Sequence, residues 1–86
     1  MSTTIGSSDA YADCREAEWL LSRLATDLLR LPFERRTRML HVRALKLKRL
    51  VGQWGRAMPS DTERIATRQS ILSLRREAAG WRELLR

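Results

Sequence analysis

The sequence predicts an all-α fold, a small three-helix bundle with up-down-up topology. Apolar residues recur at alternating spacings of four and three over three long segments, which is typical of helices with one buried face. Each of the two breaks between these segments contains a proline, which ends or starts a helix. Only five of the 86 residues are aromatic. Because strands favour aromatic and β-branched residues, this composition also favours helices.

The first helix is expected over residues 9–31, after a flexible N-terminal arm of residues 1–8. Ser7, Ser8 or Asp9 would cap its start. Its buried face should contain the residues of the apolar series, namely Ala10, Cys14, Ala17, Leu21, Leu24, Leu28 and Leu31. Trp19 and Tyr11 lie on the outer half of this helix, where they either pack across the edge of the bundle or mark a protein contact.

The second helix is expected over residues 32–56. Pro32 disfavours helical angles at Leu31 and suits the first turn of a new helix. The apolar series restarts there in a different phase, with Phe33, Thr37, Leu40, Ala44, Leu47, Val51 and Trp54. Since the two apolar faces differ by roughly 150° on a continuous helix, a sharp turn or a strong kink must separate them.

The third helix is expected over residues 60–85. Gly55 is the expected C-cap of the preceding helix, and Ser60 with Glu63 forms a capping-box pattern. The buried face should contain Thr67, Ile71, Leu74, Ala78, Trp81 and Leu85. The competing architecture is a helical hairpin plus a third helix whose core is completed by dimerisation, so a homodimer stays an alternative.

The net charge of +7 is concentrated in the middle of the chain. Residues 32–59 contain eight bases and one acid, whereas residues 1–31 contain three bases and five acids. On a helical wheel five of these eight bases lie opposite the predicted buried face. We refer to five of them as the basic strip: Arg35, Arg38, Lys46, Arg49 and Arg56. A one-sign strip of this kind points towards a negatively charged partner, although charge runs on small helices are often no more than a solvated face.

Residues for catalysis are scarce. His41 is the only histidine and Cys14 the only cysteine, and these two residues are too few for a zinc site in a single chain. A nucleophilic cysteine would need a partner histidine and an electropositive, partly exposed site, whereas Cys14 lies on the predicted buried face. No glycine-rich phosphate loop is present. We therefore expect a protein that is not an enzyme and that uses no cofactor or metal. The lone cysteine, the absence of a secretory signal pattern and the lack of a long apolar run lead us to expect a cytoplasmic protein.

These observations lead to one functional prediction and one alternative. We predict a small binding protein, acting as a regulator, inhibitor or assembly adaptor, that docks an acidic protein surface through the basic strip. The alternative is a DNA- or RNA-binding protein that uses the same strip for phosphate contacts. Binding to a membrane surface is not expected, because the apolar face of the second helix is needed for the core.

Overall fold

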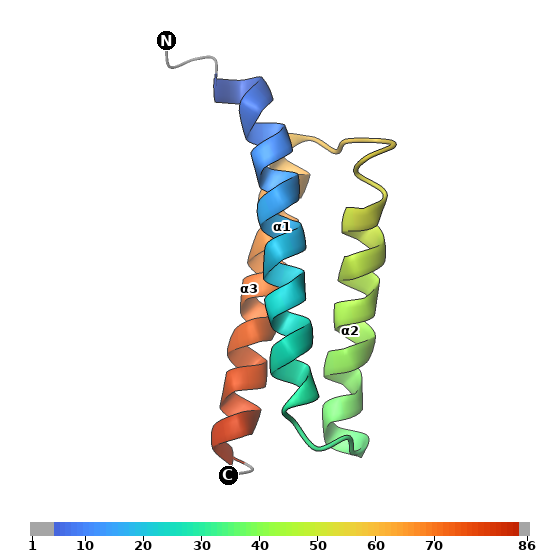
Figure 1. Ribbon diagram of the computed structural model, residues 1–86, viewed down its shortest axis with the longest axis vertical. Helices are drawn as coiled ribbons and strands as arrows, with labels where there is room; N and C mark the ends of the chain where they lie inside the picture. Colours follow the sequence, from blue (N-terminus) through green and yellow to red (C-terminus); the bar gives the residue numbers. More distant parts are fainter. Residues whose placement is uncertain (1–4, 85–86) are drawn as a thin grey trace.

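The computed structural model describes residues 5–84, with side chains from Ala10 onwards, and confirms the predicted three-helix bundle. Helices α1 (Ile5–Leu29), α2 (Arg35–Gly52) and α3 (Asp61–Leu84) run alternately down, up and down in Figure 1. All three helices pack against one another, and no strand occurs among the described residues. Each helix therefore has two neighbours, and the bundle has three helix–helix interfaces.

The core contains most of the predicted apolar faces. Leu24 of α1 and Ile71 and Leu74 of α3 have no exposed surface. The other buried apolar residues are Ala17, Leu20, Leu21, Leu28, Leu31, Leu40, Val51, Trp54 and Ala78. Cys14, Ala44, Leu47, Leu72 and Trp81 pack against this cluster while partly exposed. Burial of this apolar surface drives the association of the helices. Packing of these faces also supplies most of the stability of each helix.

The break at Pro32 is a turn, which is why α1 and α2 are antiparallel neighbours. Its anchor is the hydroxyl of Thr37, which is fully buried. Thr37 Oγ1 lies 2.8 Å from the Pro32 carbonyl, to which it can donate, and accepts a hydrogen bond of 3.1 Å from the Glu34 backbone N–H. Thr37 therefore holds the turn through polar contacts, in addition to filling its place in the apolar series.

Phe33 is not in the core, contrary to the sequence prediction. Its side chain is 74% exposed and its ring packs against His41, with 5.4 Å between the ring centroids. The wheel placed Phe33 on the buried face by extending the α2 periodicity back to Pro32. However, α2 begins only at Arg35, and Glu34 before it has extended backbone angles. Helical spacing therefore does not apply at Phe33.

The helix ends also differ from the predicted bounds. α1 begins at Ile5, so residues 5–8 of the expected arm have helical backbone, while residues 1–4 and Leu85 lie outside the described residues. α2 ends at Gly52 with Gln53 as C-cap, not at Gly55. No described glycine has the positive φ that a left-handed C-cap needs. Ser60 does cap α3, since its Oγ accepts the backbone N–H of Glu63 at 3.3 Å.

Candidate partner-binding site

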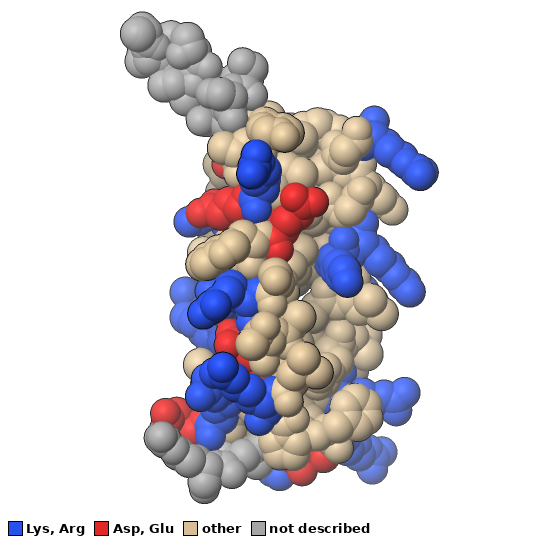
Figure 2. Space-filling model, viewed as in Figure 1, with Lys and Arg blue, Asp and Glu red and all other residues tan. Residues whose placement is uncertain are grey.

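The basic strip lies on the solvent side of the bundle. Arg35, Arg38, Lys46 and Arg49 are exposed residues of α2, and Arg56 is exposed in the connection after its end. The four α2 residues span about 21 Å along the helix. Figure 2 shows Lys and Arg side chains projecting along the outer edge of α2, whereas basic and acidic side chains lie side by side on the opposite edge of the molecule.

None of the five strip residues forms an ion pair with a described carboxylate. The ion pairs of α2 involve other arginines. Arg36 contacts Glu34 at 2.8 Å, and Arg43 contacts Glu77 of α3 at 2.9 Å. The strip is therefore a row of like charges that the described part of the chain does not neutralise.

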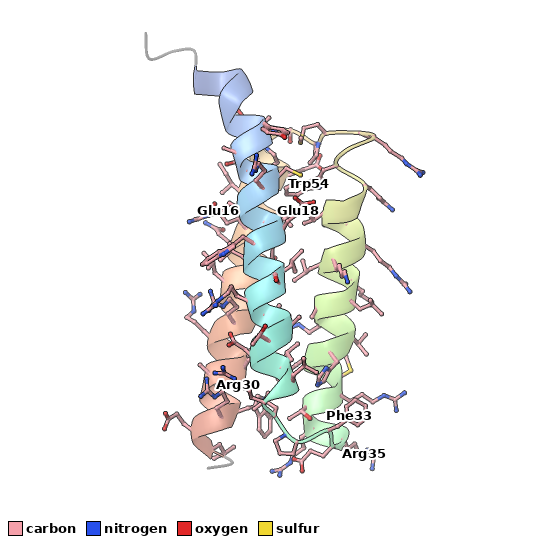
Figure 3. The ribbon with its side chains drawn as sticks, viewed as in Figure 1. Glu16, Glu18, Arg30, Phe33, Arg35 and Trp54 are labelled. Atoms are coloured by element: carbon pink, nitrogen blue, oxygen red, sulfur yellow. The ribbon has the colours of Figure 1, made fainter. Side chains whose placement is uncertain are left out.

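Three acidic residues of α1 face α3 instead of the strip. Asp13 pairs with Arg64, Glu16 with Arg68 and Asp27 with Arg75, at Nε to carboxylate oxygen distances of 3.1, 2.8 and 3.4 Å. In Figure 3 Glu16 points towards the α3 side of α1, and Glu18 towards the α2 side. These three pairs join α1 to α3 along most of their shared length. They also explain why these three acids do not offset the charge of the strip.

Arg64 is the most buried of the charged residues between Ala10 and Leu84, with 5% of its side chain exposed. Its Nε donates to Asp13, its Nη1 donates to the Pro59 carbonyl at 2.8 Å, and its Nη2 pairs with Asp61. The hydrogen bond to Asp13, supported by the charge of Asp61, raises the pKa of Arg64 further above its ordinary value, although burial opposes this. This residue joins the start of α3 to α1 and to the preceding loop.

The α1–α2 interface has a different chemistry. No ion pair or side-chain hydrogen bond joins α1 to α2 among residues 10–84. An apolar groove lies between the two helices instead, with hollows of about 250 and 440 Å³ that share Leu21, Ala25 and Lys48. The remaining lining residues are Glu18, Ser22, Leu28, Leu29, His41, Ala44, Leu45, Val51 and Gly52. The surface between the two helices in Figure 2 is largely neither acidic nor basic.

Exposed apolar side chains accompany the strip on both sides. Leu45 lies towards the groove, while Met39 and Leu50 lie towards α3 on the helical wheel. All three have more than two fifths of their surface exposed. The outer surface of α2 is thus a mixture of cationic and apolar groups, which is a composition common in protein contacts.

Trp19 and Tyr11 are exposed, at 59% and 66%, so neither packs into the bundle edge. Each ring instead lies next to an arginine one turn later in α1. The Arg23 guanidinium is 5.8 Å from the Trp19 ring centroid, and the Arg15 guanidinium is 5.7 Å from that of Tyr11. Both aromatic residues therefore remain available to a protein partner, although they lie apart from the strip, which belongs to α2.

The two residues whose side chains are most often catalytic, Cys14 and His41, are both partly buried. Cys14 packs against the core, and burial, followed by the charge of Glu18, raises the pKa of its thiol. A raised pKa reduces the fraction of reactive thiolate. His41 is partly buried, and its Nε2 atom has no hydrogen-bond partner among the described residues. The described residues contain no group of three potential metal ligands.

Two features of the structure were not predicted from the sequence. The first is the role of Arg64, although a signal existed: Arg64 lies three residues before Thr67, and so it continues the buried series of α3. The second is the groove. The sequence feature that could have indicated the groove is a set of small residues on the facing sides of the two helices, which leave space between them: Ser22, Ala25, Ala44 and Gly52.

No described helix is both long enough and apolar enough to span a bilayer. In comparisons with known proteins the chain matches no family model, and neither a curated protein nor a solved structure shows significant similarity to it.

Proposed function

We propose that the protein is a small non-enzymatic binding protein, a regulator, inhibitor or assembly adaptor, that docks an acidic protein surface through the basic strip of α2. The observation that supports this proposal best is the division of charge. The α1 carboxylates Asp13, Glu16 and Asp27 pair with α3, while Arg38, Lys46 and Arg49 have no acidic partner among residues 10–84. Like charges along one helix face repel each other, and an acidic surface would remove that repulsion.

The apolar residues beside the strip favour a protein over a nucleic acid. A phosphate backbone offers charge and hydrogen-bond acceptors, which Arg38 and Arg49 could meet, but it offers nothing to Met39, Leu45 or Leu50. A protein surface can cover cationic and apolar side chains together, with the apolar contacts excluding water from the charged pairs.

The test is a capture experiment with two variants of equal charge. The strip variant contains Arg38→Glu, Lys46→Glu and Arg49→Glu. The control variant contains Arg30→Glu, Arg76→Glu and Arg82→Glu, three exposed arginines away from the strip. Each is immobilised beside the unchanged chain, incubated with lysate of the source cells with and without nuclease, and analysed by quantitative mass spectrometry. Circular dichroism checks that all three chains keep their helices.

We expect acidic proteins that bind the unchanged chain and the control variant but not the strip variant, whether or not nuclease is present. Equal losses for both variants would contradict a special role for the strip. A nuclease-sensitive signal, together with affinity for a labelled DNA or RNA duplex that falls steeply with salt, would favour the nucleic-acid alternative instead.

A further inference from the structure

We propose that the α1–α2 groove receives an amphipathic helix of the partner, with its apolar face in the groove and acidic residues on the flank that faces α2. This inference rests on the proposed function and specifies the chemistry of the partner. It concerns a surface different from the strip itself, because the groove is lined by residues of both α1 and α2.

The shape of the groove matches a short helix. Its lining runs from Glu18 to Leu29 on α1 and from His41 to Gly52 on α2, which corresponds to about 16 Å on each helix. That length accommodates roughly three helical turns. The small side chains of Ala25, Ala44 and Gly52 keep the groove open. A partner helix could place apolar side chains at positions i, i+3 or i+4, and i+7 between the two walls.

The two groove walls differ in charge. Lys48 lies in the α2 wall, and the exposed residues Arg38 and Arg49 come next around that helix. On the α1 side the lining is neutral, with Ser22 and Leu29, apart from Glu18 at one end. Beyond the lining, the exposed Arg15 lies about one turn before Glu18 on α1, so a helix seated in the groove would meet its cations mainly along the α2 flank. Acidic residues on that flank would be attracted to α2 and would fix the orientation of the helix.

A second copy of this chain is a poor match for the groove. In a symmetric dimer each copy presents the same surface to the other. Two copies that met groove to groove would bring their α2 cations close together, and each chain has a net charge of +7. Among the described residues, Asp13, Glu16 and Asp27 of α1 are also paired with α3, so these three carboxylates are not free to face the α2 cations of another copy.

The test uses three designed helical peptides of about 15 residues, a length that spans the groove with one extra turn. The first has leucines at helical spacing and glutamates on one flank. The second has the same leucines with lysines in place of the glutamates, and the third has the same glutamates with serines in place of the leucines. Affinities are measured by fluorescence anisotropy, and the binding site of each peptide is mapped by amide chemical-shift changes in the isotopically labelled chain.

We expect the leucine–glutamate peptide to bind about tenfold more tightly than either control peptide, which corresponds to about 1.4 kcal/mol. Its shift changes should include residues 18–29 and 41–52. Ala25→Gln, which places a longer polar side chain in the groove, should weaken this binding about fivefold. Ala66→Gln, at an exposed site of α3, makes the same change outside the groove and should leave binding unaltered. Both sites tolerate glutamine in a helix.

Three results would overturn the inference, and they differ in what they mean for the proposed function. Equal binding of the serine–glutamate peptide would show that the strip recognises acidic residues while the groove takes no helix. Equal binding of the leucine–lysine peptide would remove the acidic flank and count against both proposals. A dimer in analytical ultracentrifugation that Ala25→Gln dissociates would assign the groove to a second copy.

Discussion

The two interfaces that α1 makes, one with α3 and one with α2, differ in how they are closed. Three arginine–carboxylate pairs cross between α1 and α3, and Arg64 is buried among them. Between α1 and α2 no described side chains form an ion pair, and an apolar groove remains open. The charged side chains of α1 are therefore distributed unevenly between its two interfaces. Ion pairs within the chain close one interface, and the other keeps an open apolar groove.

This difference also determines where positive charge accumulates. Asp13, Glu16 and Asp27 of α1 pair with α3, so these three acids do not offset the bases of α2. Surface ion pairs contribute little to stability individually, so we expect the division to matter more for the proposed binding than for folding.

Leu74→Ala should have the largest effect. Leu74 is fully buried in α3, and its truncation should lower the free energy of unfolding by about 2–5 kcal/mol through lost burial and a residual cavity. Leu29→Ala makes the same change in the groove, where the side chain is 83% exposed, and should cost less than about 0.5 kcal/mol. Urea denaturation followed by circular dichroism measures both. Similar losses would contradict the contrast between a closed and an open interface.

Arg64→Leu should lower the Tm by about 5–10 °C. The substitution removes the contacts of the guanidinium with Asp13, Asp61 and the Pro59 carbonyl. Arg76→Leu is the control, because Arg76 is exposed on the same helix without a described partner, and its Tm should change little. Thermal melts of the two variants that coincide would mean that Arg64 does not hold α3 to α1.

A double-mutant cycle of Asp27→Asn and Arg75→Gln should give a coupling free energy of about 0.5 kcal/mol at low salt, since both side chains are partly buried. Asp27→Asn combined with Arg49→Gln provides the control cycle, and its coupling should be close to zero. A coupling of Asp27 to Arg49 as large as its coupling to Arg75 would contradict the assignment of this carboxylate to α3.

The smallest expected effect is a rise in Tm when charges of the strip are removed, whereas removal of a paired charge lowers it. Lys46→Gln with Arg49→Gln should raise the Tm slightly at low salt, by about 1–3 °C, because the substitution relieves repulsion within the strip. The gain should disappear in about 0.5 M NaCl, where charges are screened. Arg68→Gln, which breaks the pair with Glu16, should lower the Tm instead. Scanning calorimetry at both salt concentrations would reveal whether the two changes are opposite.

The sequence predicted the architecture well because helical periodicity is a local signal. The series through Leu21, Leu24 and Leu28, and the series through Thr67, Ile71 and Leu74, lie in the core as predicted. The predictions failed where the helix had not yet started or had already ended. Phe33 precedes α2, and Gly55 follows it, so the wheel placed the first wrongly and the capping rule misassigned the second.

Contacts between helices were harder to predict than the helices themselves. Periodicity predicts which face of α1 is buried, but it does not predict whether α2 or α3 lies on a given side of that face. Whether Asp13, Glu16 and Asp27 meet α2 or α3 depends on the packing arrangement, and the structure places them against α3. The groove depends on the same information, since Ala25 and Gly52 form a hollow only because α1 and α2 lie side by side.

We propose that α2 offers a partner a row of cations that no described carboxylate pairs with, because Asp13, Glu16 and Asp27 of α1 occupy Arg64, Arg68 and Arg75 of α3. Titration of the isotopically labelled chain with a short polyglutamate peptide, followed by amide chemical shifts, tests it most directly. We predict that the largest changes fall on residues 35–50 of α2. Changes concentrated on residues 64–75 of α3 would contradict it, because that result would mean that the arginines facing α1 are the ones open to an acidic ligand.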